Sequence, residues 1–176
     1  MRGLKMTELS LRTRESFDAV MRKYADMVYR LAYARTGSTF DADDILQEVF
    51  LRYIRADKTY NDEEHRKAWL IRITVNCTRS FAASAYNRHR DYAEPDENEG
   101  AEDPSLKAAE TKSDVMKALL ELPEKYRTAI YLFYYEDMSV AQIARSLGTT
   151  ETNVKTRLSR GREMLKEKLK GAEFDV

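Results

Sequence analysis

The spacing of hydrophobic residues predicts helices throughout the N-terminal half of the chain. Steps of three and four residues keep apolar side chains on one side of a helix. A first helix of this kind ends at Gly37 and would bury Phe17, Met21, Tyr24, Val28 and Leu31. No stretch alternates apolar and polar residues convincingly, so the pattern predicts no strand.

A second and a third helix follow in the same half. The second begins at Asp41, a predicted N-cap, and carries Asp43 and Asp44 in its first turn, where carboxylates favour the helix dipole. Its apolar side consists of Leu46, Val49, Phe50 and Tyr53. The third runs from about Lys67 to Tyr86 and would bury Leu70, Ile73, Cys77 and Phe81.

The C-terminal third contains the pattern of a helix-turn-helix. Helices over 115–122 and 124–135 are separated by Pro123, which cannot continue the first of them. The next predicted helix would bury Val140, Ile143, Ala144 and Leu147. Gly148 can supply the left-handed conformation that ends it, and Thr149 or Thr150 would cap the helix that follows.

The two sides of this last helix differ in chemistry. One side would be buried and consists of Val154, Leu158, Gly161 and Leu165. The other carries Thr152, Lys155, Thr156, Ser159 and Arg160. Basic side chains neutralise phosphates and reach guanine, while short hydroxyl residues let a helix enter the DNA major groove. A solvated charged face would explain this side alone, but not the preceding helix, glycine turn and cap that agree with it.

An acidic segment, residues 93–113, separates the two helical groups. Six acids and no base occur from Glu94 to Asp103, and almost no large apolar residue is present. Such a composition cannot bury enough surface to order itself. The sequence therefore predicts an all-α protein in which two small helical domains, residues 10–92 and 114–172, are joined by a flexible acidic linker.

The formal net charge of zero is the sum of opposed blocks. Between Lys155 and Lys170 there are seven basic and two acidic residues. A net charge of zero is therefore compatible with a DNA partner. The longest apolar run, Ala129 to Tyr135, is far shorter than the roughly 20 residues that a membrane span requires. With no signal peptide apparent at the N-terminus, we expect a cytoplasmic protein without membrane insertion.

Several classes of chemistry find no support in the sequence. One cysteine, Cys77, excludes a disulfide within the chain, and only His65 and His89 supply imidazoles, which argues against a metal site. Neither histidine lies in a recognisable catalytic arrangement, and there is no phosphate-binding glycine loop. We expect no enzymatic activity, no cofactor and no small-molecule substrate.

Three segments together resemble bacterial sigma factors. The segment LPEKYRTAIYLFYYEDMSVAQIARSLGTTETNVKTRLSRGREML resembles region four of that family. FDADDILQEVFLRYI is similar to the core-binding helix of region two, and KAWLIRITVNCTRSF to the promoter-reading helix after it. Because the extra regions of larger members are absent, the chain is identified as a member of the extracytoplasmic-function (ECF) subgroup of the sigma-70 family.

The resemblance implies a promoter-specificity subunit whose partners are core RNA polymerase, promoter DNA and an anti-sigma factor. The core-polymerase contact would be an acidic face around an exposed leucine, formed by Asp41, Asp44, Gln47, Glu48 and Leu51. A solvated face with pairs such as Glu48 and Arg52 is the alternative interpretation.

The same resemblance assigns two DNA contacts. Trp69, Arg72, Asn76 and Arg79, with the loop Lys58 to Lys67, would read the melted minus-ten element. Asn153, Lys155, Thr156, Ser159 and Arg160 would read the minus-thirty-five element. Arg88, His89 and Arg90 replace the dense arginine run of many relatives, which implies weaker contacts to upstream phosphates.

Several alternatives stay open at this point. Trp69 is equally explained as a core residue, and the acidic linker as a solvated tether instead of a segment in the RNA path of polymerase. A stand-alone helix-turn-helix regulator would use the C-terminal domain but leave the N-terminal domain unexplained. Translation from Met1 and from Met6 are both compatible with the sequence.

Overall fold

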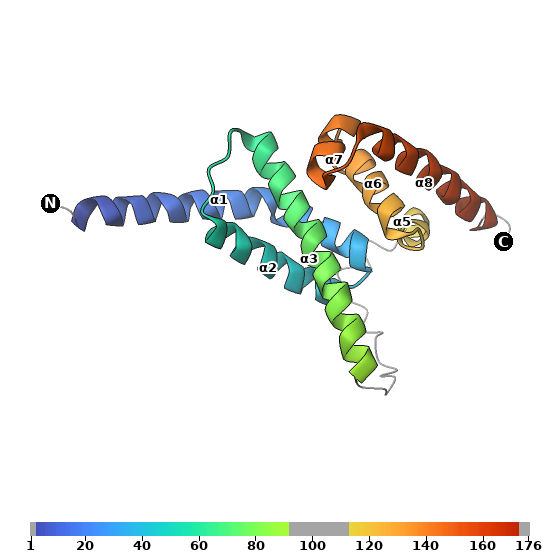
Figure 1. Ribbon diagram of the computed structural model, residues 1–176, viewed down its shortest axis with the longest axis horizontal. Helices are drawn as coiled ribbons and strands as arrows, with labels where there is room; N and C mark the ends of the chain where they lie inside the picture. Colours follow the sequence, from blue (N-terminus) through green and yellow to red (C-terminus); the bar gives the residue numbers. More distant parts are fainter. Residues whose placement is uncertain (1–2, 92–112, 173–176) are drawn as a thin grey trace.

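The chain folds into helices that form two groups (Figure 1). The computed structural model describes the backbone of residues 3–91 and 113–172 and the side chains of residues 17–84 and 114–171. The N-terminal group contains α1 (Gly3–Thr36), α2 (Thr39–Ala56) and α3 (Glu63–Asp91). The C-terminal group contains α5 (Ser113–Leu120), α6 (Glu124–Tyr134), α7 (Val140–Leu147) and α8 (Glu151–Ala172). The described residues include no strand, so the expectation of an all-α fold is confirmed.

The N-terminal helices enclose a core from all three elements. Tyr24, Val28 and Leu31 of α1 are buried as predicted, and Phe17 packs against the core from its margin. Met21 is 37% exposed, so its assignment to the core was wrong. Val20, one position earlier, is buried in its place because the buried side of α1 is centred nearer to Val20 and Met27.

The start of α2 differs from the prediction. Ser38 is the N-cap, and its side-chain oxygen accepts a hydrogen bond from the Asp41 N–H at 3.2 Å. Asp41 therefore occupies the third helical position, and Asp43 and Asp44 lie beyond the first turn. The prediction of Asp41 as the N-cap was wrong, because serine caps a helix about as well as aspartate and the chain after Gly37 enters the helix at Ser38.

The third helix also begins earlier than expected. Asp62 accepts a hydrogen bond from the His65 N–H at 2.7 Å, which caps α3 one turn before Lys67. The loop before α3 is correspondingly shorter than Lys58 to Lys67. At the other end, the acidic linker lies outside the described residues except for Ser113, which already belongs to α5.

The helix-turn-helix has the predicted geometry. Gly148 adopts a left-handed backbone with φ of 64° and closes α7. Thr150 accepts a hydrogen bond from the Asn153 N–H at 3.1 Å, so it is Thr150 that caps α8. Val154, Leu158 and Gly161 are buried, and Leu165 packs partly buried against the core.

The two groups lie directly against each other. In Figure 1, α3 passes beside α7, and α1 ends near α6; contacts between both pairs of helices join the halves. Since α3 is covered by α1 and α2 on one side and by α7 on another, it buries more residues than its own stripe predicts. Leu70 and Cys77 are buried as expected, but so are Ile71, Thr74, Val75 and Thr78.

Candidate nucleic-acid interface

The outer side of α8 presents all of the predicted minus-thirty-five residues to solvent. Asn153, Lys155, Thr156, Ser159 and Arg160 are all exposed. The opposite side is anchored by Val154 at 0% and Leu158 at 3% exposure. Gly161 allows α8 to approach α6 closely, because a Cβ there would lie 3.0 Å from Cγ1 of Ile130. The helix is therefore held firmly by one side while the other stays accessible.

Three of these exposed residues also make local contacts. The Asn153 amide donates to the Thr149 hydroxyl at 3.0 Å across the turn. The Thr156 hydroxyl donates to the Thr152 carbonyl at 3.0 Å. A hydrogen bond from Arg160 lowers the pKa of the Tyr126 hydroxyl, and the nearby Lys125 adds to the effect. Arg160 therefore lies at the edge of the outer side nearest α6.

The outer side of α2 carries the predicted core-polymerase residues. Gln47 is exposed and Leu51 is 45% exposed, while Asp41, Asp44 and Glu48 are half-buried. Glu48 accepts a hydrogen bond from Nε of Arg52 at 2.6 Å, the intrahelical pair expected of a solvated face. Glu48 is thus already paired with Arg52, whereas Leu51 is exposed on the same side of α2.

Sequence reasoning missed two apolar members of this surface. Phe40 is 76% and Ile54 is 54% exposed. Leu51 follows Phe40 by eleven residues and Ile54 follows it by fourteen. This spacing places the three side chains on one side of the helix. In the sequence, Phe40 and Ile54 could have been found as apolar residues that lie outside the predicted apolar side of the helix. Exposed apolar residues that lie together mark a protein contact more strongly than single ones do.

The residues of the predicted minus-ten site divide into two environments. Asn76 and Arg79 are exposed on α3. Trp69 is half-buried and packs edge-on against Tyr53 and Tyr60, with ring centroids 6.0 Å away in both cases. Tyr60 stacks on Tyr53 at 5.9 Å, so the indole is the end of an aromatic cluster. Trp69 is therefore compatible with both interpretations given above, a core residue and a DNA contact, because it packs against other rings but is only half-buried.

Arg72 is turned toward the C-terminal group. Its guanidinium donates to main-chain carbonyls of α7, and Trp69 and Arg72 both line a cavity of about 560 Å³ between α3 and α7. Val75, which lies between Arg72 and Arg79 in the sequence, is only 4% exposed.

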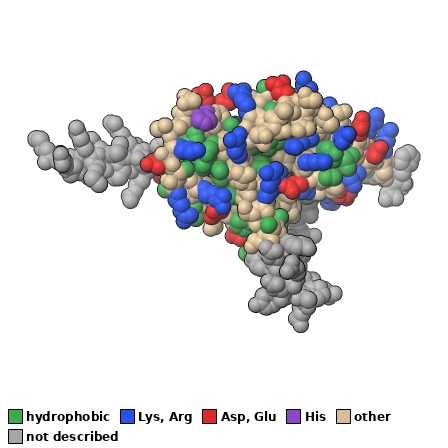
Figure 2. All heavy atoms as spheres, viewed as in Figure 1, with side chains coloured by type: hydrophobic (Ala, Val, Ile, Leu, Met, Phe, Trp, Pro, Cys, Tyr) green, Lys and Arg blue, Asp and Glu red, His purple; other side chains and the backbone are tan. Residues whose placement is uncertain are grey.

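Charge on the visible face is mixed. Figure 2 shows Lys and Arg side chains over α3, α7 and α8 with acidic side chains among them. The side chains of Arg88, His89 and Arg90 lie outside the described residues. Among the helices that the structure describes, none combines the length and apolar character needed to cross a bilayer.

Comparison with known proteins matches both halves of the chain. Residues 20–88 match the family model for sigma-70 region 2, and residues 112–165 match that for sigma-70, region 4. The ECF RNA polymerase sigma factor SigW of Bacillus subtilis is 30% identical over 172 residues, which cover 89% of this chain and 90% of SigW. The chain belongs to the ECF sigma factors. The resemblance inferred from the sequence is thereby confirmed.

Other ECF sigma factors give the same result. SigE of Mycolicibacterium smegmatis is 34% identical over 88% of this chain, which spans only 62% of SigE. SigM of Mycobacterium tuberculosis is 31% identical, over 86% of this chain and 76% of SigM. The match to region 2 accounts for the N-terminal half, so it does not favour a stand-alone helix-turn-helix regulator.

Solved structures of sigma factors share the fold. The sigma factor RpoE from Bartonella quintana, in complex with the anti-sigma factor NepR, aligns with a TM-score of 0.65 at 22% identity, over 92% of this chain and 99% of RpoE. CnrH, in complex with the cytosolic domain of CnrY, aligns with a TM-score of 0.66 at 21% identity, over 90% of each chain. At these identities the likeness concerns the fold of this ECF sigma factor.

Proposed function

We propose that this ECF sigma factor directs core RNA polymerase to specific promoters and assists DNA melting through binding energy alone. The observation that carries the proposal is the helix-turn-helix, in which α8 is anchored by Val154, Leu158 and Gly161 and offers a basic, hydroxyl-rich outer side. Such a helix suits the major groove of the minus-thirty-five element. Residues 114–172 would form the domain that reads this element.

Two surfaces of the N-terminal domain, residues 10–92, complete the proposal. The outer side of α2, centred on Asp44 and Leu51, would bind core polymerase. Asn76, Arg79, Arg72 and Trp69 on α3 would hold the melted minus-ten strand by phosphate contacts, hydrogen bonds and stacking. We place the protein in the cytoplasm, where polymerase and DNA are found.

The test of DNA recognition separates promoter reading from assembly. Lys155→Ala should lower transcription from promoters found by start-site mapping after controlled overexpression, without changing affinity for core polymerase. Loss of one phosphate contact also reduces the salt dependence of promoter binding by about one unit of slope. Lys155 gives the cleaner result because Arg160 also contacts Tyr126.

The matched control is Lys117→Ala, which removes an exposed lysine from α5 of the same domain. It should leave promoter use unchanged. If Lys155→Ala lowered core binding and promoter use equally, α8 would not be the reader of the upstream element.

The test of the polymerase contact removes one acid and one exposed apolar residue. Asp44→Ala with Leu51→Ala should weaken binding to core polymerase by about ten- to a hundredfold, since central interface residues each contribute more than 1 kcal/mol. The control is Asp18→Ala with Met21→Ala, an exposed acid and a 37% exposed apolar residue on α1. Recovery of core enzyme by both variants alike in a pull-down would disprove the assignment of α2.

Regulation of the protein is inferred from the complexes in the solved structures. The relatives RpoE and CnrH form complexes with NepR and CnrY, and NepR is an anti-sigma factor. We propose that an anti-sigma factor likewise restrains this chain, and that residues 93–113 link the domains along the RNA path of polymerase.

A further inference from the structure

The loop between α2 and α3, residues 57–62, belongs to the predicted minus-ten site. It leaves α2 at Asp57, whose left-handed backbone, with φ of 42°, ends that helix. The next two residues are exposed, whereas Tyr60 stacks on Tyr53 with ring centroids 5.9 Å apart. The first half of the loop is thus attached to the N-terminal core through the Tyr60 ring.

The second half of the loop is held by His65, in the first turn of α3. The Asn61 N–H donates to Nδ1 of His65 at 3.2 Å, and the His65 N–H donates to the Asp62 carboxylate at 2.7 Å. The His65 ring also lies edge-on to the Tyr60 ring, with centroids 5.5 Å apart. One imidazole therefore contacts both the backbone and the aromatic anchor of the loop.

These two hydrogen bonds are similar to the reciprocal pair of a capping box. At the start of α7, Ser139 accepts from the Gln142 N–H, and the Gln142 side chain accepts from the Ser139 N–H. The third helical residue of a capping box is a glutamate or a glutamine. In α3 that residue is His65, and its acceptor serves an N–H one position further back, within the loop. The imidazole therefore fixes the loop as well as the helix end.

An imidazole can accept this hydrogen bond in only one charge state. Nδ1 must be unprotonated to accept from the Asn61 N–H, so the contact requires the neutral ring with its proton on Nε2. Protonation of Nδ1 would set one donor against another and break the contact. Histidine is the side chain that changes charge between about pH 5 and 8. A glutamine in the same place would keep its acceptor throughout that range.

The charged groups around His65 come from both sides of the cavity that it lines. They are Asp62, Glu64, Lys67, Arg72, Glu136, Asp137 and Arg145. Glu64 pairs with Arg145 at 2.7 Å, and Glu136 pairs with Lys67 at 3.6 Å. The Arg66 guanidinium lies over the Tyr60 ring, 5.4 Å from its centroid. A proton on His65 would therefore add a positive charge near Arg66 and near two acids that already have cationic partners.

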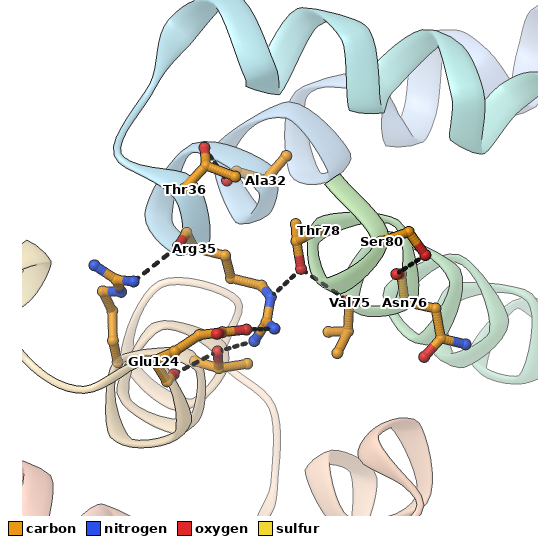
Figure 3. Close-up of polar contacts among 10 residues, drawn as sticks. Ala32, Arg35, Thr36, Val75, Asn76, Thr78, Ser80 and Glu124 are labelled. Atoms are coloured by element: carbon orange, nitrogen blue, oxygen red, sulfur yellow. Dashed lines mark hydrogen bonds and ion pairs between the residues drawn. The ribbon is translucent and has the colours of Figure 1, made fainter. Parts of the chain in front are cut away.

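The helical part of the predicted site is fixed independently of His65. The buried Arg35 of α1 donates through Nε to the Thr78 hydroxyl of α3 at 2.7 Å. Figure 3 shows Thr78 turned toward Arg35 and Asn76 on the other side of α3. Asn76 is exposed there. The placement of Asn76 thus depends on the core, whereas the placement of the loop beside it depends on His65.

We propose that His65 is a positioning residue of the minus-ten site, whose neutral imidazole holds loop 57–62 in the conformation that receives the melted strand. The inference rests on the proposed function of α3 and of this loop. His65 acts through Asn61 and Tyr60 and touches no base itself. Loss of its contact with Asn61 releases the loop, which lowers affinity for the melted strand and leaves the contacts with core polymerase and the minus-thirty-five element unchanged.

The first experiment observes the contact in the free chain by NMR. The protein contains two histidines, so the imidazole signals that disappear in His65→Gln belong to His65. At about pH 8 the His65 ring should carry its proton on Nε2, and the Asn61 amide signal should shift as the ring becomes protonated at lower pH. A proton on Nδ1 at the higher pH, or an Asn61 amide that does not follow the ring, would overturn the proposal.

The second experiment measures DNA binding by the chain assembled on core polymerase. The probe is a fluorescent fork DNA whose single strand carries the minus-ten element of a promoter found by start-site mapping. A duplex that contains only the minus-thirty-five element is measured in parallel, which corrects for effects of pH on polymerase. Relative to the duplex, affinity for the fork should fall about three- to tenfold from about pH 8 to about pH 5.5, as expected for the loss of one hydrogen bond.

Two substitutions separate the acceptor of His65 from its charge, with circular dichroism to verify the fold. His65→Gln keeps an acceptor and should bind the fork like the wild type at about pH 8, without the loss at about pH 5.5. His65→Lys has a charge and no acceptor, so it should bind about three- to tenfold more weakly at the higher pH. Equal pH dependence of the wild type and His65→Gln would overturn the proposal. Binding by His65→Lys as tight as that of the wild type would do the same.

The proposed function and the role of His65 fail in different ways. Failure of the proposed function would appear as missing core binding and missing initiation by the wild type. Failure of the positioning role would leave both intact and would appear in the imidazole signals and in the pH profile of fork binding.

Discussion

Gly161 is the position where one added methyl group should disturb the recognition helix most directly. It lies within α8, on the side that packs against α6. A Cβ at this position would lie 3.0 Å from Cγ1 of Ile130, 3.3 Å from its Cδ1 and 3.4 Å from Cβ of Tyr126. The perturbation is Gly161→Ala, the smallest change that adds this atom.

Two opposing contributions determine the expected magnitude. Alanine favours a helix interior by about 1 kcal/mol over glycine. Against this, Ile130 is only 3% exposed and β-branched, so its Cγ1 has one preferred position and cannot turn aside. The contact is relieved only if α6 and α8 move apart, and such overpacking costs about 1–3 kcal/mol. We therefore expect a net loss of about 1 kcal/mol in the free energy of unfolding.

Equilibrium unfolding in urea, followed by circular dichroism, measures this loss. Gly171→Ala is the matched control, because Gly171 belongs to the same helix and an added Cβ there meets nothing within 4 Å. The control should be neutral or stabilising by up to about 1 kcal/mol. If Gly161→Ala stabilised the protein as much as Gly171→Ala does, close packing of α6 on α8 would not be the reason for a glycine at position 161.

Two further predictions concern single hydrogen bonds. Ser139→Ala should lower the free energy of unfolding by about 1 kcal/mol in urea, since Ser139 and Gln142 form a reciprocal capping box at the start of α7; Ser139→Asp should recover most of it. Tyr24→Phe should raise the pKa of Glu63 toward its usual value, because the Tyr24 hydroxyl donates to that carboxylate at 2.6 Å and thereby lowers its pKa. The stability lost in Tyr24→Phe should therefore be present above the ordinary glutamate pKa and shrink as pH falls through the lowered one. Identical carboxyl titrations of both proteins by NMR would contradict the second prediction.

Helix positions and the helix-turn-helix were predictable because they depend on neighbours in the sequence. The spacing of Val154 and Leu158 indicates the buried side of a helix, and Gly148 indicates a helix end. Both indications depend only on residues a few positions away. Helix ends were less predictable: Asp41 was predicted as the N-cap of α2, but Ser38 occupies that position. Leu51 was recognised as accessible, but Phe40 and Ile54 required the structure, because apolar residues are usually assumed to be buried.

The contact between the N-terminal and C-terminal domains could not be predicted from the sequence. Val75 and Thr78 lie between Arg72 and Arg79 in the sequence, yet both are buried. The partners of Arg35 lie 43 and 93 residues away along the chain, at Thr78 and Thr128. Periodicity describes which side of a helix is apolar, but it cannot tell which distant helix will cover a polar side.

Local spacing and capping chemistry were enough to define the helices, the recognition helix and the membership of a family whose motifs are short and ordered along the chain. Packing of α1 and α3 against α6 and α7 then decided that Arg72, a predicted DNA contact, donates to main-chain carbonyls of α7. The physical reason is that helix formation and its apolar side depend on residues within a few turns. Pairing of a buried guanidinium depends on groups brought together only by the complete fold.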